Sequence, residues 1–266
     1  MNIYLELTRA FNTNKVRTII SSGQAAVLHH IAIMSKDGDW IIREDEESLR
    51  HVLSILESYG AKYRFGAPLD IRWLSNGWSS HFEFMHQGMR VRTDFVSRPP
   101  RLSAKDLESL WFESVKQEIP YIGLIPLAEL KKTNREKDYA VIGELSRLMS
   151  DIRNQLRYSR SARDIIDIEQ KHPDVVDEIS KERPLLRQAA RGRDILEQEL
   201  DAERRRLMRA NEQRLQAYID ASSRWSSRWK ILSKTLADLP LFDAHERVVK
   251  EAESLLPVSV ERKPDA

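Results

Sequence analysis

The chain has 266 residues, with 43 basic and 41 acidic side chains and a formal net charge of +2. This length is enough for one large domain or two ordinary ones with sizeable cores, and so small a net charge argues against a tail dedicated to nucleic-acid binding. The absence of cysteine excludes disulfides, thiolate zinc sites and cysteine nucleophiles.

Nothing in the sequence indicates a membrane or secretory segment. No apolar run reaches the roughly 18 residues that a membrane-spanning helix needs. The N-terminal sequence MNIYLELTRAFN is amphipathic and contains an acidic residue, unlike a secretory signal peptide. We therefore expect a cytoplasmic protein with no membrane partner.

The first elements in chain order are a helix, a strand and a second helix. Residues 2–11 have helical periodicity, and residues 16–20 form a short β-branched run that is typical of a buried strand. Ser22 and Gly23 interrupt this run, and residues 24–34 continue with apolar positions at helical spacing. The Ser-Gly pair either caps this helix or offers free backbone N–H groups to an anion.

Strand, helix and hairpin patterns follow. Residues 39–42 predict a strand, and residues 44–60 predict a helix with an acidic first turn and a glycine at its end. The alternating segment 70–74 indicates another strand. Two further strand patterns, 79–85 and 89–96, flank His86-Gln87-Gly88 and predict a β-hairpin.

The second half of the chain is predicted to be helical. Residues 103–115 read as a helix capped by Ser103, and residues 127–149 as one or two helices. After about residue 150 alternation almost disappears, and residues 193–239 contain neither Gly nor Pro, which predicts a long helix or helical hairpin. We place a domain boundary near residue 150, between an α/β domain (1–150) and an all-α domain (151–266).

Asp37 and Asp39 lie two residues apart at the start of a predicted strand. In an extended backbone such residues point to the same face, so the two carboxylates lie side by side. Their repulsion is relieved by a hard cation such as Mg²⁺, which prefers carboxylate oxygen. The alternative is a surface turn whose aspartates bond to their own backbone.

Asp94 is a third candidate, near the end of the second hairpin strand. It shares a strand face with Arg90 and Arg92. Either it completes a cluster of acids, or it forms an exposed ion pair with Arg92 or Arg72, worth less than about 1 kcal/mol.

Two sequence stretches together resemble the nucleotidyltransferase superfamily. The stretch SSGQAAVLHH…SKDGDW is similar to its glycine-start helix followed by Asp-x-Asp, and LAELKKTNREKDYAVIGEL is similar to its later signature. The likeness covers roughly residues 15–150 and is to the small bacterial branch with toxin-like, abortive-infection enzymes. It implies a nucleotidyltransferase-like mixed sheet in the first domain.

The resemblance also implies an activity and its site. Asp37, Asp39 and Asp94 would bind two Mg²⁺ ions and carry the transfer of a nucleotidyl group from an NTP to an RNA or protein acceptor. The implied nucleotide-binding residues are Ser22, Gly23, Lys131 and Lys132. Arg135, Lys137 and Asp138 would fix the start of the signature helix. The helical domain would supply a surface for a substrate, a protein partner or a second copy of the chain.

The alternative function is a catalytically degenerate nucleotidyltransferase fold that acts as a binding or assembly module. Arg90 and Arg92 can neutralise Asp94, and Trp40 is bulkier than the aliphatic residue usual after Asp-x-Asp. This alternative predicts that Asp94 is paired with an arginine and that the cleft is filled by side chains such as Trp40 or by the helical domain.

Other conspicuous residues have structural explanations. Trp225 and Trp229 stack a base or, in the favoured interpretation, pack their helix against the first domain. His29 falls in an apolar helix and is expected to be partly buried with a hydrogen-bond partner. The alternative for the stretch KKTNREKD is a solvated helix start with Thr133 or Asn134 as its cap.

Overall fold

The computed structural model describes residues 2–260, which divide into two compact units. The first contains the residues up to Ile122 and those from Leu215 onward, and the second contains Gly123–Arg214. These units do not follow the boundary expected near residue 150, because the last helices belong to the first unit. No helix among the described residues is both long and apolar enough to cross a membrane.

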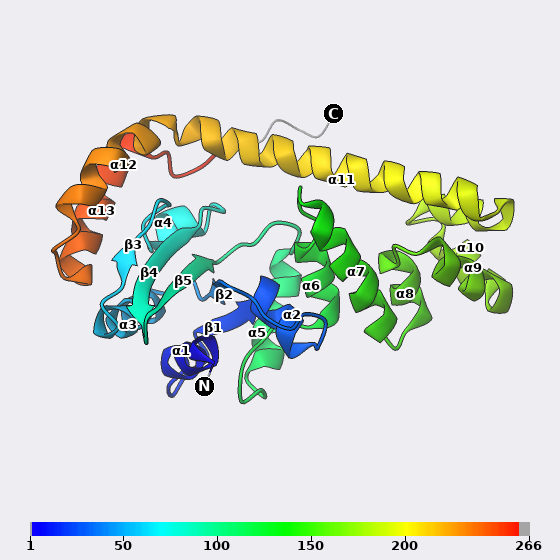
Figure 1. Cartoon of the computed structure of the whole chain (residues 1–266), viewed down its shortest axis with the longest axis horizontal. Coiled ribbons are helices and arrows are strands. Elements are labelled where there is room, and N and C mark those ends of the chain that lie inside the picture. The colour runs from blue at the N-terminus through cyan, green and yellow to red at the C-terminus, as the bar shows by residue number, and fades with distance from the viewer. Residues whose placement is uncertain (1, 261–266) are drawn as a thin grey trace. The chain divides into compact units, whose positions relative to one another are not determined.

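A five-stranded mixed sheet forms the centre of the first unit (Figure 1). Its order is β1 (Thr18–Ser21), β2 (Gly38–Ile42), β5 (Met89–Val96), β4 (Ser80–His86) and β3 (Lys62–Tyr63). Strand β2 is parallel to β5, and the other neighbours are antiparallel. The predicted hairpin is confirmed: β4 and β5 are joined at Gln87 and Gly88, which both have positive φ, as a tight two-residue turn requires.

Among residues 2–260, seven helices lie wholly within the first unit. They are α1 (Ile3–Phe11), α2 (Ser22–Leu28), α3 (Glu46–Ser58), α4 (Ile71–Leu74), α5 (Ala104–Ser114), α12 (Ser223–Thr235) and α13 (Leu241–Leu255). Helix α3 begins after Asp45, whose side chain accepts a hydrogen bond from the Ser48 N–H at 2.8 Å. Ser103 caps α5 in a capping box with Asp106, which confirms the predicted helix start.

One face of the sheet is closed by an aromatic core. Trp40 is fully buried and stacks on Phe95 with 5.4 Å between ring centroids, while Phe11 of α1 meets the Trp40 ring edge-on at 5.5 Å. The indole Nε1 of Trp40 donates to Thr8 Oγ1 at 2.9 Å. Because successive residues of a strand face opposite sides, the neighbours Asp39 and Asp94 lie on the other face of the sheet.

Two sequence predictions are wrong in detail. Residues 71–74 form the short helix α4 rather than a strand, since Asp70 accepts from the Arg72 N–H at 2.8 Å and Trp73 turns into the core. Helix α2 ends at Leu28 instead of continuing to residue 34. His30 has a φ of +59°, which ends the helical path, and Ile33 beyond it is 99% exposed.

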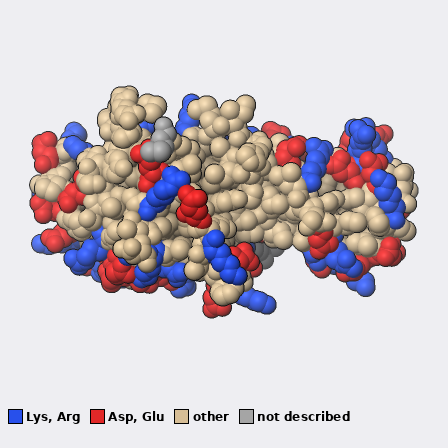
Figure 2. Space-filling view, turned by 90° about the horizontal axis from the view of Figure 1, so that it is seen from below, with Lys and Arg blue, Asp and Glu red and all other residues tan. Residues whose placement is uncertain are grey.

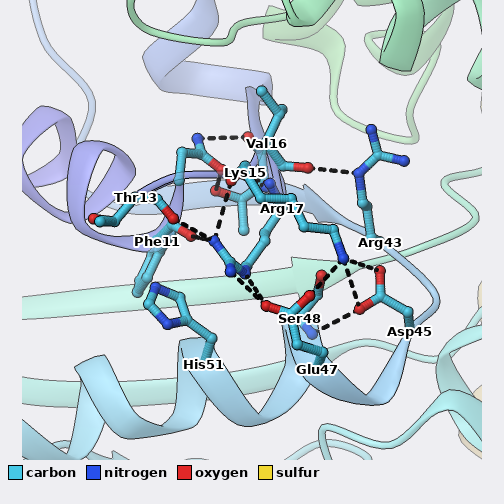
Figure 3. Close-up of polar contacts among 12 residues, drawn as sticks. Phe11, Thr13, Lys15, Val16, Arg17, Arg43, Asp45, Glu47, Ser48 and His51 are labelled. Atoms are coloured by element: carbon cyan, nitrogen blue, oxygen red, sulfur yellow. Dashed lines mark hydrogen bonds and ion pairs between the residues drawn. The ribbon is translucent and has the colours of Figure 1, made fainter.

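Arg17 fixes the loop that leads into β1 (Figure 3). Its guanidinium is buried and donates to the backbone carbonyls of Thr13 at 2.7 Å and Lys15 at 3.2 Å. It also pairs with Glu47 at the start of α3, and Lys15 reaches the same carboxylate at 2.6 Å. These contacts, with Lys15 the larger cause, lower the pKa of Glu47 to about 2. The start of β1 is thereby held against α3.

The packing role expected of the tryptophans on α12 is confirmed. Trp225 is fully buried and donates from Nε1 to the Gly66 carbonyl at 2.8 Å. Trp225 and Trp229 join Trp73 and Trp78 in one apolar cluster. These aromatic side chains are therefore part of the core of the first unit.

The second unit is helical throughout. Its elements are α6 (Leu124–Leu130), α7 (Glu136–Leu148), α8 (Ile152–Tyr158), α9 (Ala162–Lys171), α10 (Pro173–Ile179), the 3₁₀ helix η1 (Pro184–Arg191) and most of α11 (Arg193–Ala221). Leu156, Ile165, Ile179 and Leu186 lie in its apolar core. Every element named after β5 is a helix, in agreement with the helical second half that the sequence predicts.

Candidate active site

The three predicted aspartates share the polar face of the sheet. Asp39 on β2 pairs in register with Asp94 on the parallel neighbour β5. Directly paired residues of neighbouring strands point to the same side. Asp37 lies in the bend just before β2, and its Oδ1 is 3.6 Å from Nη1 of Arg92, which shares a face of β5 with Asp94. The late aspartate thus lies beside the early pair, and we call Asp37, Asp39 and Asp94 the acidic group.

Asp94 contacts two cationic or ionisable side chains. Its Oδ1 lies 3.3 Å from Arg64 Nη1 and 2.7 Å from Nδ1 of His81, which is the partner of Asp94 in the β4–β5 register. The Asp94 side chain is 24% exposed. The partners predicted for it, Arg92 and Arg72, are wrong: Arg92 faces Asp37, and Arg72 pairs with Asp70.

Asp37 is only loosely paired. Its Oδ1 lies 3.6 Å from Arg92 Nη1, beyond hydrogen-bond distance, and this buried oxygen has no hydrogen-bond partner. Nearby, the Tyr4 hydroxyl donates to the Lys36 carbonyl at 2.5 Å. Burial, followed by the charge of Asp37 and then that of Asp39, raises the pKa of Tyr4. The phenol therefore responds to the negative charge of these two aspartates.

Ser22 and Gly23 lie at the start of α2, after β1. Ser22 has a φ of +52°, and a Cβ atom on Gly23 would collide with the Ser35 side chain. The loop that carries Ser35 is attached to α2 by Gln24, whose Nε2 donates to the Ser35 carbonyl at 3.0 Å. The glycine is thus required by close packing of this loop. A phosphate-binding role for the Ser-Gly pair stays a prediction.

Lys131 and Lys132 belong to the second unit, where each is already paired with an acid. Lys131 is buried, with Nζ 3.3 Å from Asp138 Oδ1. Lys132 Nζ lies 2.6 Å from Glu129 Oε1. Their predicted contact with phosphates remains untested, but both side chains have a local structural role.

Asp138 is held by several groups at the start of α7, as the sequence predicts for this residue and Arg135. Its Oδ2 accepts from Thr133 Oγ1 and Arg135 Nε, each at 2.7 Å. Burial alone would raise the pKa of Asp138, but these hydrogen bonds and the charges of Lys131 and Arg135 outweigh it and lower the pKa. Neither Thr133 nor Asn134, the two caps of the alternative interpretation, is the helix cap, since Arg135 occupies that position without a side-chain cap.

The carboxylates fit a hard cation by chemical type, though not in their present positions. Three carboxylates on one face, one of them with a buried oxygen that lacks a hydrogen bond, are suitable donors for Mg²⁺. Within residues 2–260, however, no group of three or more His, Cys, Asp or Glu side chains lies close enough together to hold a metal ion. Metal binding therefore requires the carboxylates of the acidic group to move closer together.

Two further residues, Trp40 and His29, are not part of the acidic group. Trp40 points to the apolar face, so its expected role in filling a cleft beside the aspartates is wrong. His29 is partly buried, and its Nε2 lies 2.9 Å from the Ile122 carbonyl, as expected for a histidine with a structural partner.

Sequence reasoning missed His81 and Arg64. His81 was identifiable, because counting back from the two-residue turn at Gln87-Gly88 places it opposite Asp94. Arg64 was not, since it follows the two-residue strand β3, which has no periodic pattern. Its backbone N–H donates to the His81 carbonyl at 2.8 Å, which brings it to Asp94.

Basic and acidic side chains are interspersed on the surface shown in Figure 2, and no broad area of that face has a single sign. This face therefore offers no single-sign surface of the kind that binds nucleic acid electrostatically. Comparisons with protein-family models, with curated proteins and with solved structures found no match to this chain.

Proposed function

We propose that the first unit is a nucleotidyltransferase-like domain that transfers a nucleotidyl group from an NTP to an RNA or protein acceptor, in a toxin-like manner. The observation that carries the proposal is the register of β2 with β5, which places Asp39 beside Asp94 on the face that Asp37 shares. Carboxylates stacked side by side are electrostatically unfavourable and are common where a metal ion binds.

In this proposal the acidic group holds Mg²⁺, with two ions expected. When bound, the metal would offset charge on the attacking and leaving oxygens of the transfer. Arg64 and Arg92 compete with the metal for Asp94 and Asp37, and the NTP phosphates give these guanidinium groups another anionic partner. Binding of Mg²⁺ and NTP together would thus release the carboxylates.

The start of α2 would accept the triphosphate through Ser22 and Gly23. Asp138 and Glu129 pair with the charges of Lys131 and Lys132, and the contact of these lysines with the phosphates stays a prediction.

A second function is favoured by the same contacts. Arg64 at 3.3 Å from Asp94 is the arrangement expected of a degenerate fold that serves as a binding or assembly module. That alternative predicts that the acidic group remains paired with arginines in the presence of NTP and Mg²⁺, and that no transfer occurs.

The deciding experiment is incubation of the full chain with labelled NTPs, Mg²⁺ and cell extract. We expect label transfer by the wild type and its loss in Asp37→Ala/Asp39→Ala. The matched control, Asp167→Ala/Asp238→Ala, removes two exposed acids outside the acidic group and should retain transfer. Transfer that persists in the first double variant would contradict the mechanism, and its absence in the wild type would favour the binding module.

A further inference from the structure

Ser79 lies on the same sheet face as the acidic group. It immediately precedes β4 and stands two residues before His81, so its side chain points to the same side, about 7 Å along the strand. Ser79 is half-buried, whereas the next residue, Ser80, is fully buried on the opposite face. The Ser79 hydroxyl is therefore available on the polar face.

The Ser79 hydroxyl is connected to the acidic group through His81. Ser79 Oγ lies 2.8 Å from His81 Nε2, and His81 Nδ1 lies 2.7 Å from Asp94 Oδ1. The second contact is a close approach and not an aligned hydrogen bond, since the buried Nδ1 makes none. The nearby carboxylate favours the tautomer with the proton on Nδ1, which leaves Nε2 to accept from the hydroxyl.

Gly66 makes room for this arrangement. A Cβ atom on Gly66 would lie 2.5 Å from Cδ2 of His81 and 3.0 Å from the Ser79 carbonyl oxygen. The same carbonyl accepts from the Ala67 N–H at 2.9 Å, which fixes the backbone of Ser79. The packing thus holds both the imidazole and the serine in place.

A serine hydroxyl that donates to an imidazole is the pairing that activates serine as a nucleophile. The carboxylate of Asp94 lies close to the far side of this imidazole without the hydrogen bond of a complete triad. Here the nucleophile lies on the face where we place NTP and metal. An acceptor fixed beside the reacting phosphorus avoids the entropic cost of bringing in a second molecule.

We propose that Ser79 is an acceptor of the nucleotidyl group, so that the protein modifies itself. This inference rests on the proposed transfer function and names its acceptor. Ser79 Oγ attacks the α-phosphorus of the NTP and forms an oxygen–phosphorus bond. The bond from the α-phosphorus to the bridging oxygen of the β-phosphate breaks, pyrophosphate leaves with that electron pair, and the hydroxyl proton passes to His81 Nε2.

Intact-mass and peptide mass spectrometry of the full chain, incubated with each NTP and Mg²⁺, tests the proposal. The expected result is the gain of one nucleoside monophosphate unit on the peptide that contains Ser79. Ser79→Ala should abolish the gain, and Ser79→Thr, which keeps a hydroxyl, should retain part of it. His81→Gln should slow the gain by about 100-fold, the effect of losing a general base.

Ser58→Ala is the matched control. Its hydroxyl is exposed near the end of α3 and bonds only within that helix turn, to the Ile55 carbonyl at 2.7 Å. This variant should be modified at the wild-type rate. Circular dichroism melting of each variant shows whether lost modification reflects lost folding, and Ser79→Thr keeps the test valid if Ser79→Ala unfolds.

The same reaction with labelled NTP and cell extract distinguishes self-modification at Ser79 from the proposed nucleotidyl transfer on which it depends. Transfer to extract components with no mass gain at Ser79 would overturn the inference and leave the proposed function standing. Modification of the chain at a different residue would also overturn it. No transfer to any acceptor would reject both.

Discussion

Two groups of charged side chains in this molecule differ in how completely they are paired. At the start of α7, Asp138 is 4% exposed and has Lys131, Arg135 and Thr133 as partners. On the sheet, Asp37 is 42% exposed, has one arginine at 3.6 Å and keeps an oxygen without a hydrogen bond. Asp138 in the first group is buried and fully paired, whereas Asp37 in the second is half-exposed and incompletely paired.

This difference bears on how much each group contributes to stability. A buried carboxylate with every partner in place stabilises its surroundings strongly once formed, because removing one partner leaves a charge without compensation. Half-exposed ion pairs contribute about 0 to 1 kcal/mol, and neighbouring like charges oppose even that. The stacking of Asp39 beside Asp94 is consistent with our proposal that these acids bind a cation.

The largest expected effect is on stability at Asp138. Asp138→Asn removes the charge that compensates buried Lys131, and we expect the free energy of unfolding to fall by about 3 kcal/mol. Urea denaturation of the full chain measures it. The control Asp167→Asn, an exposed acid 3.9 Å from Arg163, should change it by less than about 0.5 kcal/mol. If the two substitutions lowered the free energy of unfolding equally, the buried pairing of Asp138 would contribute no more than an exposed ion pair.

The same carboxylate should make stability depend on pH. The Thr133 hydrogen bond, with the charges of Lys131 and Arg135, lowers the pKa of Asp138 in the folded state despite burial. The unfolded chain then binds a proton at higher pH than the folded chain, so this stabilisation is complete above about pH 5 and is lost as the pH falls through the folded pKa.

Unfolding free energies of the wild type and Asp138→Asn, measured from pH 6 down to pH 3, test this dependence. The difference between the two proteins should be constant above about pH 5 and shrink below about pH 4. A difference that stays constant to pH 3 would show that Asp138 is not stabilised in its charged form.

The sequence could predict the acidic group only in pieces. Alternation places Asp37 with Asp39, and the Gln87-Gly88 turn fixes the β4–β5 register, because both are local patterns. That Asp39 meets Asp94 depends on β2 pairing with a strand some fifty residues later, and periodicity does not determine such non-local neighbours. Only the resemblance of the motif order implied it.

Errors in the predicted elements arose where tertiary contacts overrode local pattern. Residues 71–74 alternate like a strand, yet Asp70 caps a helical turn that buries Trp73. Residues 31–34 continue an apolar pattern, yet the chain leaves the helix at His30 and Ile33 is exposed. The return of α12 to the first unit depends on Trp225 packing, which the sequence predicted only as one of two alternatives.

The smallest expected effect concerns the acidic group, whose Asp37 is incompletely paired. Arg92→Gln removes the cation nearest Asp37, at 3.6 Å in a half-exposed pair, so we expect the free energy of unfolding to change by less than about 1 kcal/mol. Because that cation competes with metal for the carboxylate, Mn²⁺ as a probe for the Mg²⁺ site should bind more tightly, with Kd lower by about two- to fivefold.

Titration of Mn²⁺ followed by electron paramagnetic resonance measures this change in the full chain. Arg163→Gln, which removes an 80% exposed guanidinium from the second unit, should leave Kd unchanged. Weaker Mn²⁺ binding in Arg92→Gln would mean that Arg92 positions Asp37 rather than competing for it. Unchanged Mn²⁺ binding, together with a loss of stability as large as that of Asp138→Asn, would instead mean that the acidic group has a structural role like that of Asp138.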